Sequence, residues 1–308
     1  MRLLRCLSVS GSAAVLAGTF MLAGQAPVPS GPGAAAVPAR AASPRGTSRP
    51  PSAAFLAQAR RALTGYLRRG HSRIGLVHPR EMHTGAPTVE VGTTRLSSYN
   101  WSGYADVSAT SQTFSSVSGE WRTPTMTCSR EDTITSEWVG LDGFNSPTVE
   151  QAGTVGWCFE GTPTYFTWYE MYPSGTVEVG TSLRPGDKVT ATVSRGGTSY
   201  TLALTDATHA ANSFSVTKPC PLTTCLDTSA EWVAERPSFQ IGIAPLADYH
   251  RWTVHNASVT ANGTAGTISS YRSSYKINMM DATGSYQLST TSYLVGGRCF
   301  SDYWLGSY

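Results

Sequence analysis

From about residue 96 to the end, the chain consists of short stretches in which apolar and polar residues alternate. The alternation is clearest in residues 114–121, 200–204 and 252–254, where Thr, Ser, Val, Tyr and Trp are frequent. Turn-forming Pro, Gly, Asn and Asp residues separate these stretches. A period of two is typical of half-buried strands. The pattern therefore predicts an all-β domain over residues 96–308, an antiparallel β-sandwich of two stacked sheets.

A different pattern precedes this domain. Residues 27 to about 52 are rich in Pro, Ala, Gly and Ser, a composition that buries too little apolar surface to fold alone. In residues 52–69, apolar positions recur near the 3.6-residue period of a helix, with Ser52 as an N-cap and Gly70 after the end. The sequence therefore predicts one amphipathic helix near 52–69.

Residues 1–26 have the three parts of a secretory signal peptide. Arg2 and Arg5 give a positive start, an apolar stretch follows from about residue 7 to 22, and small residues close it at 23–26. Ser and Gly interrupt the apolar stretch, which is short for a stable bilayer span. We therefore expect a secreted, extracellular protein without stable membrane association.

Charge differs sharply between the two remaining parts. Residues 27–95 hold ten Lys and Arg against two Asp and Glu, a net charge of +8, whereas residues 96–308 hold eleven against eighteen, a net −7. A basic arm before an acidic body is also compatible with nucleic-acid binding, but export and the lack of a nucleic-acid motif oppose it. The better interpretation is a basic propeptide over 27–95, which lies on an acidic catalytic domain and inhibits it.

Of the six Cys residues, Cys6 leaves with the signal peptide and five remain. An exported chain permits disulfides, and we expect the pairs Cys128–Cys158 and Cys220–Cys225, although other pairings fit the sequence. Cys299 is left over, either free or paired with another chain. No Cys or His lies beside these residues in a zinc-ligand pattern, so no metal and no cofactor is expected.

Five short segments carry the chemistry of this chain. They are Asn100–Gly103, Trp138–Gly143, Val149–Gly153, Trp168–Glu170 and Ser229–Pro237. Taken together they resemble the glutamic peptidases (eqolisins), in the family's order and at similar separations over roughly residues 97 to 295. The resemblance implies a secreted acid endopeptidase of bacterial type, acting on proteins or peptides and made as a zymogen. It also implies a lectin- or glucanase-like sandwich with a concave face.

The resemblance identifies Gln151 and Glu235 as the catalytic dyad. In acid, a Glu with an ordinary pKa near 4.3 still offers some carboxylate, so Glu235 can act as general base on water. The neutral Gln151 amide keeps its N–H donors at any pH and can stabilise an oxyanion. In a strand, Glu231 and Glu235 share one face, whereas Glu150 points away from Gln151.

Four further residues match positions that line or support the family's cleft: Trp101, Trp138, Asp142 and Glu170. Trp138 fits the core of the domain equally well. Asp142 either braces the turn that leads to Gln151 or simply forms a turn. The chain departs from the fungal pattern at Phe166 and in a shorter loop around Ser146 and Pro147. Residues 296–308 are an addition for which the sequence suggests no role.

A second interpretation is a carbohydrate-binding or glycoside-hydrolysing β-sandwich. Aromatic side chains stack on sugar rings, and Glu170 with Glu235 would be the two carboxylates that glycoside hydrolysis needs. A structural cell-surface module explains the fold but not the matched segments. The sequence lacks the motifs of serine hydrolases, zinc peptidases and pepsin-like enzymes. A monomer is expected.

Overall fold

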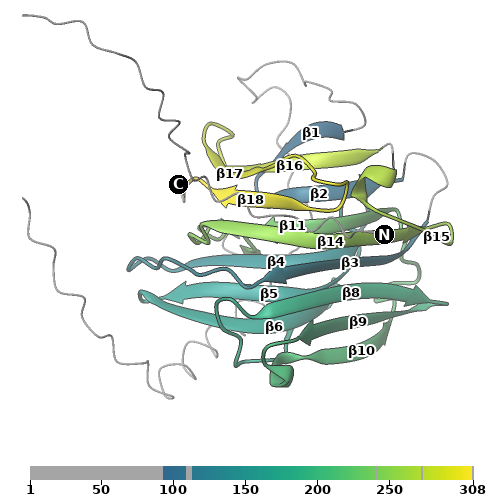
Figure 1. Cartoon of the computed structure of the whole chain (residues 1–308), viewed down its shortest axis with the longest axis horizontal. Coiled ribbons are helices and arrows are strands. Elements are labelled where there is room, and N and C mark those ends of the chain that lie inside the picture. Colours follow the sequence, from purple (N-terminus) through teal and green to yellow (C-terminus); the bar gives the residue numbers. More distant parts are fainter. Residues whose placement is uncertain (1–92, 109–112, 240–241, 272, 307–308) are drawn as a thin grey trace, which may run out of the picture. The chain divides into compact units, whose positions relative to one another are not determined.

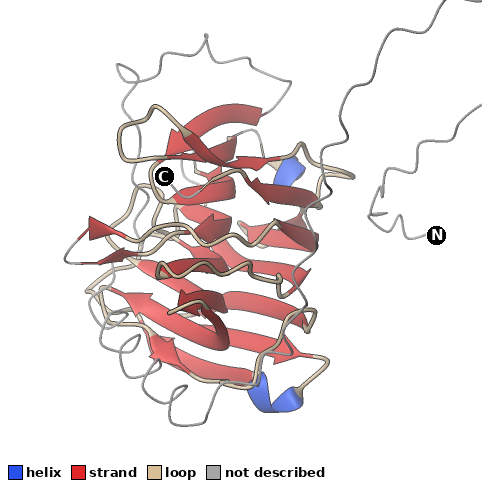
Figure 2. Ribbon diagram, turned by 90° about the vertical axis from the view of Figure 1, so that its left-hand side faces the viewer, coloured by secondary structure: helices blue, strands red, loops and turns tan. Residues whose placement is uncertain are grey.

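The computed structural model describes residues 93–108, 113–239, 242–271 and 273–306. The predicted signal peptide and the predicted helix near 52–69 lie outside the described residues. Within these ranges the chain is nearly all strand, and 3-10 turns at Ala210–Asn212 (η2) and Ile268–Ser270 (η3) are the helical elements (Figure 2). The described part contains no helix with the length and hydrophobicity needed to cross a membrane.

The strands follow one another along the chain with short connections. The first nine are β1 (Thr93–Ser98), β2 (Trp101–Val107), β3 (Phe114–Arg122), β4 (Thr133–Leu141), β5 (Val149–Phe159), β6 (Thr162–Tyr172), β7 (Val177–Glu178), β8 (Lys188–Gly196) and β9 (Ser199–Asp206). The others are β10 (Phe214–Pro219), β11 (Ser229–Glu235), β12 (Ser238–Phe239), β13 (Gly242–Ile243), β14 (Arg251–Ala261), β15 (Thr264–Gly266), β16 (Ser274–Met280), β17 (Gln287–Thr291) and β18 (Phe300–Trp304).

These strands form two stacked layers, as the alternation predicted. One layer has the order β10-β9-β8-β3-β14, and the other has the order β16-β2-β11-β4-β5-β6-β7. In Figure 1, β14 overlaps β11, β3 overlaps β4 and β8 overlaps β5, and these strands are in contact across the layers. Nearly all pairs are antiparallel, with β1 and β16 a parallel exception. The predicted antiparallel β-sandwich is confirmed.

The C-terminal addition has a structural role. Strand β18 pairs with β14 on one side and with β17 on the other, so it joins the two layers into one continuous sheet. Phe300 of β18 is buried in the core, and Asp302 accepts hydrogen bonds from Ser102 and Thr291 inside the sandwich. Residues near the C-terminus therefore close one edge of the fold.

Two apolar clusters lie on opposite faces of the second layer. The larger cluster fills the space between the layers and includes Trp121, Trp232 and Trp252. The smaller one covers the other face of β2, β11, β4, β5 and β6 and includes Trp101 and Trp138. The second layer is therefore buried on both faces, which explains why β2, β4 and β11 contain only buried residues.

Both expected disulfides are present. Cys128 pairs with Cys158, and Cys220 pairs with Cys225. The first joins the loop before β4 to the end of β5, and the second closes a short loop before β11. Cys299 is buried and disulfide-bonded, so the open expectation of a free thiol is wrong.

Glycine at position 153 is required by a close approach of two strands. A Cβ at Gly153 would lie 2.1 Å from the carbonyl oxygen of Glu137 and 2.6 Å from the Cβ of Trp138. We expect Gly153→Ala to lower the free energy of unfolding by about 3 kcal/mol or more, since backbone atoms cannot move aside cheaply. Thermal and urea unfolding measure the loss.

Gly196 provides the matched control, because a Cβ there meets nothing within 4 Å. Gly196→Ala should change the free energy of unfolding by less than about 1 kcal/mol. Equal effects of the two substitutions would contradict the close packing at Gly153.

Candidate active site

Strand register places the two predicted catalytic side chains on one face of the second layer. Glu235 ends β11 and lies opposite Ser136 of β4. Gln151 of β5 lies opposite Gly140 of the same β4 strand. Positions two apart in a strand share a face, so Ser136, Trp138 and Gly140 point to the same side. Glu235 and Gln151 therefore flank Trp138, on the face that carries the smaller apolar cluster.

The Trp138 indole connects the surroundings of the two residues. Its Nε1 donates a 2.8 Å hydrogen bond to Oε2 of Glu235. The far edge of the indole lies over Gly140. If position 140 carried a Cβ, that atom would lie 2.9 Å from Trp138 Cζ3 and 3.3 Å from the Cβ of Gln151. Gly153 lies opposite Trp138 and leaves room for its side chain. One indole thus binds Glu235 and reaches the backbone beside Gln151.

The Gln151 amide is held from β6. Register pairs Gln151 with Glu170, and Gln151 Nε2 donates a 2.6 Å hydrogen bond to Glu170 Oε2. Thr176 Oγ1 donates to the other oxygen of Glu170 at 2.9 Å. A primary amide has two N–H donors, so one remains for another acceptor. Glu170 therefore orients Gln151 and leaves it able to donate once more.

Burial controls the protonation of Glu235. The residue is 1% exposed, and burial raises the pKa of its carboxyl to about 8, with the charge of Glu170 acting in the same direction. The hydrogen bond from Trp138 opposes the rise, as do Trp101 and Asn100 nearby. The sequence predicted a carboxylate in acid, but the buried Glu235 is protonated there. It becomes a base only when water reaches it and lowers the desolvation cost.

Other polar atoms on this face are buried without a hydrogen-bond partner. They are Nε1 of Trp101 and Trp168, Oγ1 of Thr164, Oγ of Ser229, Oε1 of Gln151, Oε1 of Glu235 and both carboxylate oxygens of Glu231. Trp101 lies opposite Glu235 in β2 and packs edge-on against Trp138, with ring centroids 5.0 Å apart. Buried polar groups nearly always have partners, so this face is suited to a ligand or to water that supplies them.

Asp142 braces the segment that precedes β11. It follows β4 with a left-handed φ of 65°. Its carboxylate accepts hydrogen bonds from the backbone N–H groups of Leu226, Asp227 and Thr228 at 2.8 to 2.9 Å. Thr148, next to β5, donates to the same carboxylate at 3.4 Å. Asp142 is therefore a turn former whose main hydrogen bonds hold the segment before β11 rather than the turn that leads to Gln151.

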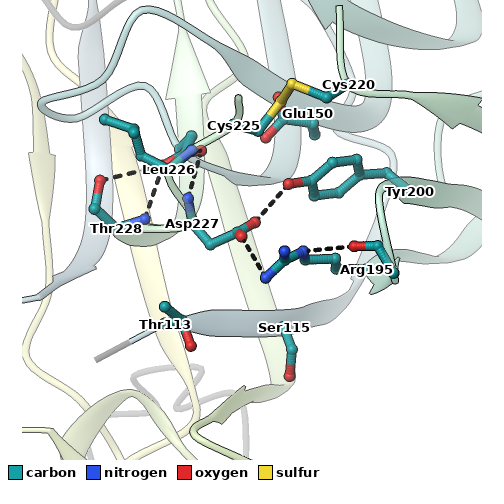
Figure 3. Close-up of polar contacts among 12 residues, drawn as sticks. Thr113, Ser115, Glu150, Arg195, Tyr200, Cys220, Cys225, Leu226, Asp227 and Thr228 are labelled. Atoms are coloured by element: carbon teal, nitrogen blue, oxygen red, sulfur yellow. Dashed lines mark hydrogen bonds and ion pairs between the residues drawn. A yellow bond between two sulfur atoms is a disulfide. The ribbon is translucent and has the colours of Figure 1, made fainter. Parts of the chain in front are cut away.

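Glu150 points away from Gln151, as strand alternation predicted. Its Oε1 lies 3.1 Å from Sγ of Cys225, beside the disulfide with Cys220 (Figure 3). A disulfide sulfur carries no hydrogen, so this contact is a hydrogen bond only when the carboxyl is protonated and donates. Burial raises the pKa of Glu150 to about 9, with the charge of Asp142 second, which agrees with this assignment.

An ion pair completes the cluster behind the Gln151 strand. Tyr200 donates a 2.6 Å hydrogen bond to Asp227 Oδ1, and Arg195 Nη1 lies 2.8 Å from Asp227 Oδ2 (Figure 3). Together with the contacts of Asp142, these bonds fix residues 226–228 just before β11. The position of Glu235 at the other end of that strand rests on this anchoring.

One group in the described residues has the spacing of a metal site. Ligand atoms of Asp187, Asp206 and His209 lie within 4.8 Å of one another. These atoms are engaged by the protein: His209 Nδ1 is 2.9 Å from Asp187 Oδ1, and Asn212 donates to Asp206. The group belongs to the β8–β9 edge of the first layer rather than to the face of Gln151. It holds that edge together.

Sequence reasoning missed three residues of this site. Thr176 lies in the turn before β7, where no local pattern marks it as a partner of Glu170. Gly140 and Gly153 did leave a signal, because glycine inside a strand pattern often marks a close approach. Both make room for Trp138.

The two-layered β-sandwich carries Glu235 and Gln151 on one face, the two residue types that the resemblance to glutamic peptidases implies. The model of the Peptidase A4 family matches residues 99–299. The chain belongs to this family, the eqolisins or glutamic peptidases that its motifs resemble, and it is a hydrolase of that kind. No curated protein sequence matches the chain.

Solved structures show the same fold. Scytalido-glutamic peptidase with a peptide-based transition state analogue has a TM-score of 0.54 and 21% identity, over 67% of this chain and 98% of that one. SCP-B, a member of the eqolisin family in complex with the tripeptide Ala-Ile-His, has a TM-score of 0.52 and 19% identity, over 67% and 98%. At these identities the likeness concerns the fold.

The buried carboxyls give stability a definite pH dependence. Burial raises the pKa values of Glu137, Glu150 and Glu235 to about 7, 9 and 8. A carboxyl with a raised folded-state pKa contributes fully below its unfolded pKa, and its contribution falls as pH rises toward the folded value. We expect the free energy of unfolding to be highest below about pH 4.5 and to fall toward pH 8, by up to about 1.4 kcal/mol per pH unit for each group. The thermal midpoint should fall with it.

Differential scanning calorimetry at fixed ionic strength between pH 3 and 8 measures this trend. Glu150→Gln removes one titrating group and should flatten the slope. A midpoint that rises or stays constant from pH 4 to 7 would contradict the raised pKa values.

Proposed function

We propose that this protein is a secreted acid endopeptidase that hydrolyses peptide bonds of proteins or peptides with the dyad Glu235 and Gln151. The observation that carries the proposal is the single Trp138 indole, which donates to Glu235 and lies over Gly140, the residue opposite Gln151. Glu235 of β11 and Gln151 of β5 thus lie on either side of Trp138, on the same face of the second layer.

Each residue has a defined part in the proposed reaction. Glu235, once deprotonated, takes a proton from water as the water oxygen attacks the scissile carbonyl carbon. The free N–H of Gln151 donates to the oxyanion that forms. Glu235 then returns its proton to the leaving amine as the C–N bond breaks, which restores the carboxylate. Glu235 therefore both accepts and returns the proton, and no second acid or base is needed.

Support for a precursor comes from charge, and the burial of the dyad is compatible with it. Gln151 is fully buried and Glu235 is 1% exposed, and a buried Glu235 holds its proton in acid. The segment 27–95 carries a net +8 against −7 for residues 96–308. We propose that this segment is a propeptide that covers the acidic catalytic domain, and that its removal hydrates Glu235. Secretion, with residues 1–26 as signal peptide, and a monomeric mature enzyme are part of the same proposal.

The carbohydrate interpretation has less support. It requires Glu170 and Glu235 as a pair of carboxylates that act on a sugar. Glu170 is instead engaged by Gln151 and Thr176, at 2.6 and 2.9 Å. In that arrangement Glu170 orients an amide, a role that peptide hydrolysis uses and glycoside hydrolysis does not.

The dyad predicts a specific pattern of lost activity. Gln151→Ala should lower kcat on a denatured protein near pH 3 to 4 by about 100- to 1000-fold, because the oxyanion loses a donor. Glu235→Gln should abolish measurable cleavage, because no base remains to activate water. Peptide release by the processed enzyme measures both effects.

An exposed carboxylate serves as control: Glu131→Gln should keep full activity, and circular dichroism should show that all variants are folded. Full activity in Gln151→Ala together with loss in Glu170→Ala would instead favour the carbohydrate interpretation. That outcome is checked directly with polysaccharide substrates.

Acid should trigger maturation. Protonation of carboxylates on the catalytic domain weakens its attraction for the basic segment, so the purified precursor should be processed within the range pH 3 to 4 and should persist at pH 7. Gel electrophoresis over time measures the conversion, and the Glu235→Gln precursor shows whether cleavage is autocatalytic. Equal processing rates at pH 4 and pH 7 would contradict this mechanism.

A further inference from the structure

Glu231 occupies a position on the active face that the proposed reaction does not use. It precedes Glu235 by four residues in β11 and therefore shares its face. The register pairs Glu231 with Gly140, and Gly140 with Gln151, so Glu231 and Gln151 lie on one line across the strands. The residue between them is a glycine and has no side chain.

The Glu231 carboxyl is buried and has no partner. The residue is 0% exposed, and neither carboxylate oxygen accepts or donates a hydrogen bond. Among the described carboxylates that have an unpartnered buried oxygen, Glu231 is the one in which both oxygens lack a partner. The Ser229 hydroxyl is near, but it also makes no hydrogen bond of normal geometry. An unsatisfied buried group of this kind costs about 1–3 kcal/mol.

The surroundings keep this carboxyl neutral. Burial raises its pKa well above the usual range, and the charges of Asp142, Glu150 and Asp106 raise it further. These three acids belong to the segments after β4, in β5 and in β2, and Tyr275 of β16 lies across β2 on the same face. A neutral carboxyl has one O–H donor and one free carbonyl acceptor.

We propose that Glu231 is a substrate-binding residue, whose neutral carboxyl forms two hydrogen bonds with the main chain of the bound substrate. A substrate residue in the extended conformation presents its own N–H and C=O on the same edge, and this pair is the complement of a carboxylic acid. The unpartnered atoms of Trp101, Trp168 and Gln151 on the same face mark it as the surface that receives a ligand. The inference rests on the proposed peptidase function and adds a binding contact beside the dyad.

Two substitutions separate binding from structure. Glu231→Leu removes both hydrogen-bonding groups and should raise KM about tenfold or more for every peptide of a varied panel, with kcat within about threefold of wild type. Glu231→Gln keeps one donor and one acceptor and should restore KM to within about threefold. Glu150→Gln, a buried acid on the opposite face, should leave KM unchanged.

The outcomes distinguish the two proposals. An active wild type with an unchanged KM in Glu231→Leu overturns the role of Glu231 and leaves the peptidase function intact. A fall in kcat and in thermal midpoint at constant KM shows a structural role and also overturns it. A KM that rises for some peptide sequences only would point to a side-chain contact and overturn the main-chain assignment. A wild type without peptidase activity overturns both proposals.

Glu231→Met replaces Glu231→Leu in the same assay if the leucine variant does not fold. Its unbranched side chain fills a similar volume without a hydrogen-bonding group, and the same rise in KM is expected.

Discussion

The hydrogen bond from the Trp138 indole to Glu235 is the contact on which the organisation of the site depends. The Trp138 side chain fits between β11 and β5 because two residues beside it are glycines. Gly140 follows it by two positions in β4, and Gly153 lies opposite it in β5. Any larger residue at either position would push the indole away from the strand that carries Gln151. The packing of one aromatic ring therefore decides whether a glutamate and a glutamine, 84 positions apart in the chain, adjoin the same group.

The interior of the domain holds several acidic side chains. Glu137, Glu150, Glu231 and Asp302 are all buried, and burial raises the pKa of each. In a neutral compartment the ionised forms would need buried cations or many donors. In acid the same groups are neutral and behave as hydrogen-bonding polar side chains. The fold is therefore most stable in a medium acidic enough to keep these carboxyls protonated.

The fold was largely predictable from the sequence, whereas the site was predictable only in part. Strand alternation predicted the sandwich, and within 229–235 it placed Glu231 and Glu235 on one face correctly. The pairing of Gln151 with Glu170 depends on the register of β5 against β6, which local alternation does not determine. The partners of Asp142 lie 84 to 86 residues away along the chain. The role of β18 could not be predicted either, because it depends on the pairing of β18 with both β14 and β17.

The line of residues Glu231, Gln151 and Glu170 explains why an amide stands in the middle. The nearest side chains on either side of position 151 along this line are acids, because Gly140 has none, and a third carboxyl there would interact with both. A carboxyl at position 151 would donate a hydrogen bond when protonated and carry a negative charge when ionised, so its properties would change with pH. The amide donates one N–H to Glu170 and keeps another whatever the protonation of its neighbours. A neutral donor with constant properties is what an oxyanion needs in acid, and the acids on either side make that constancy necessary.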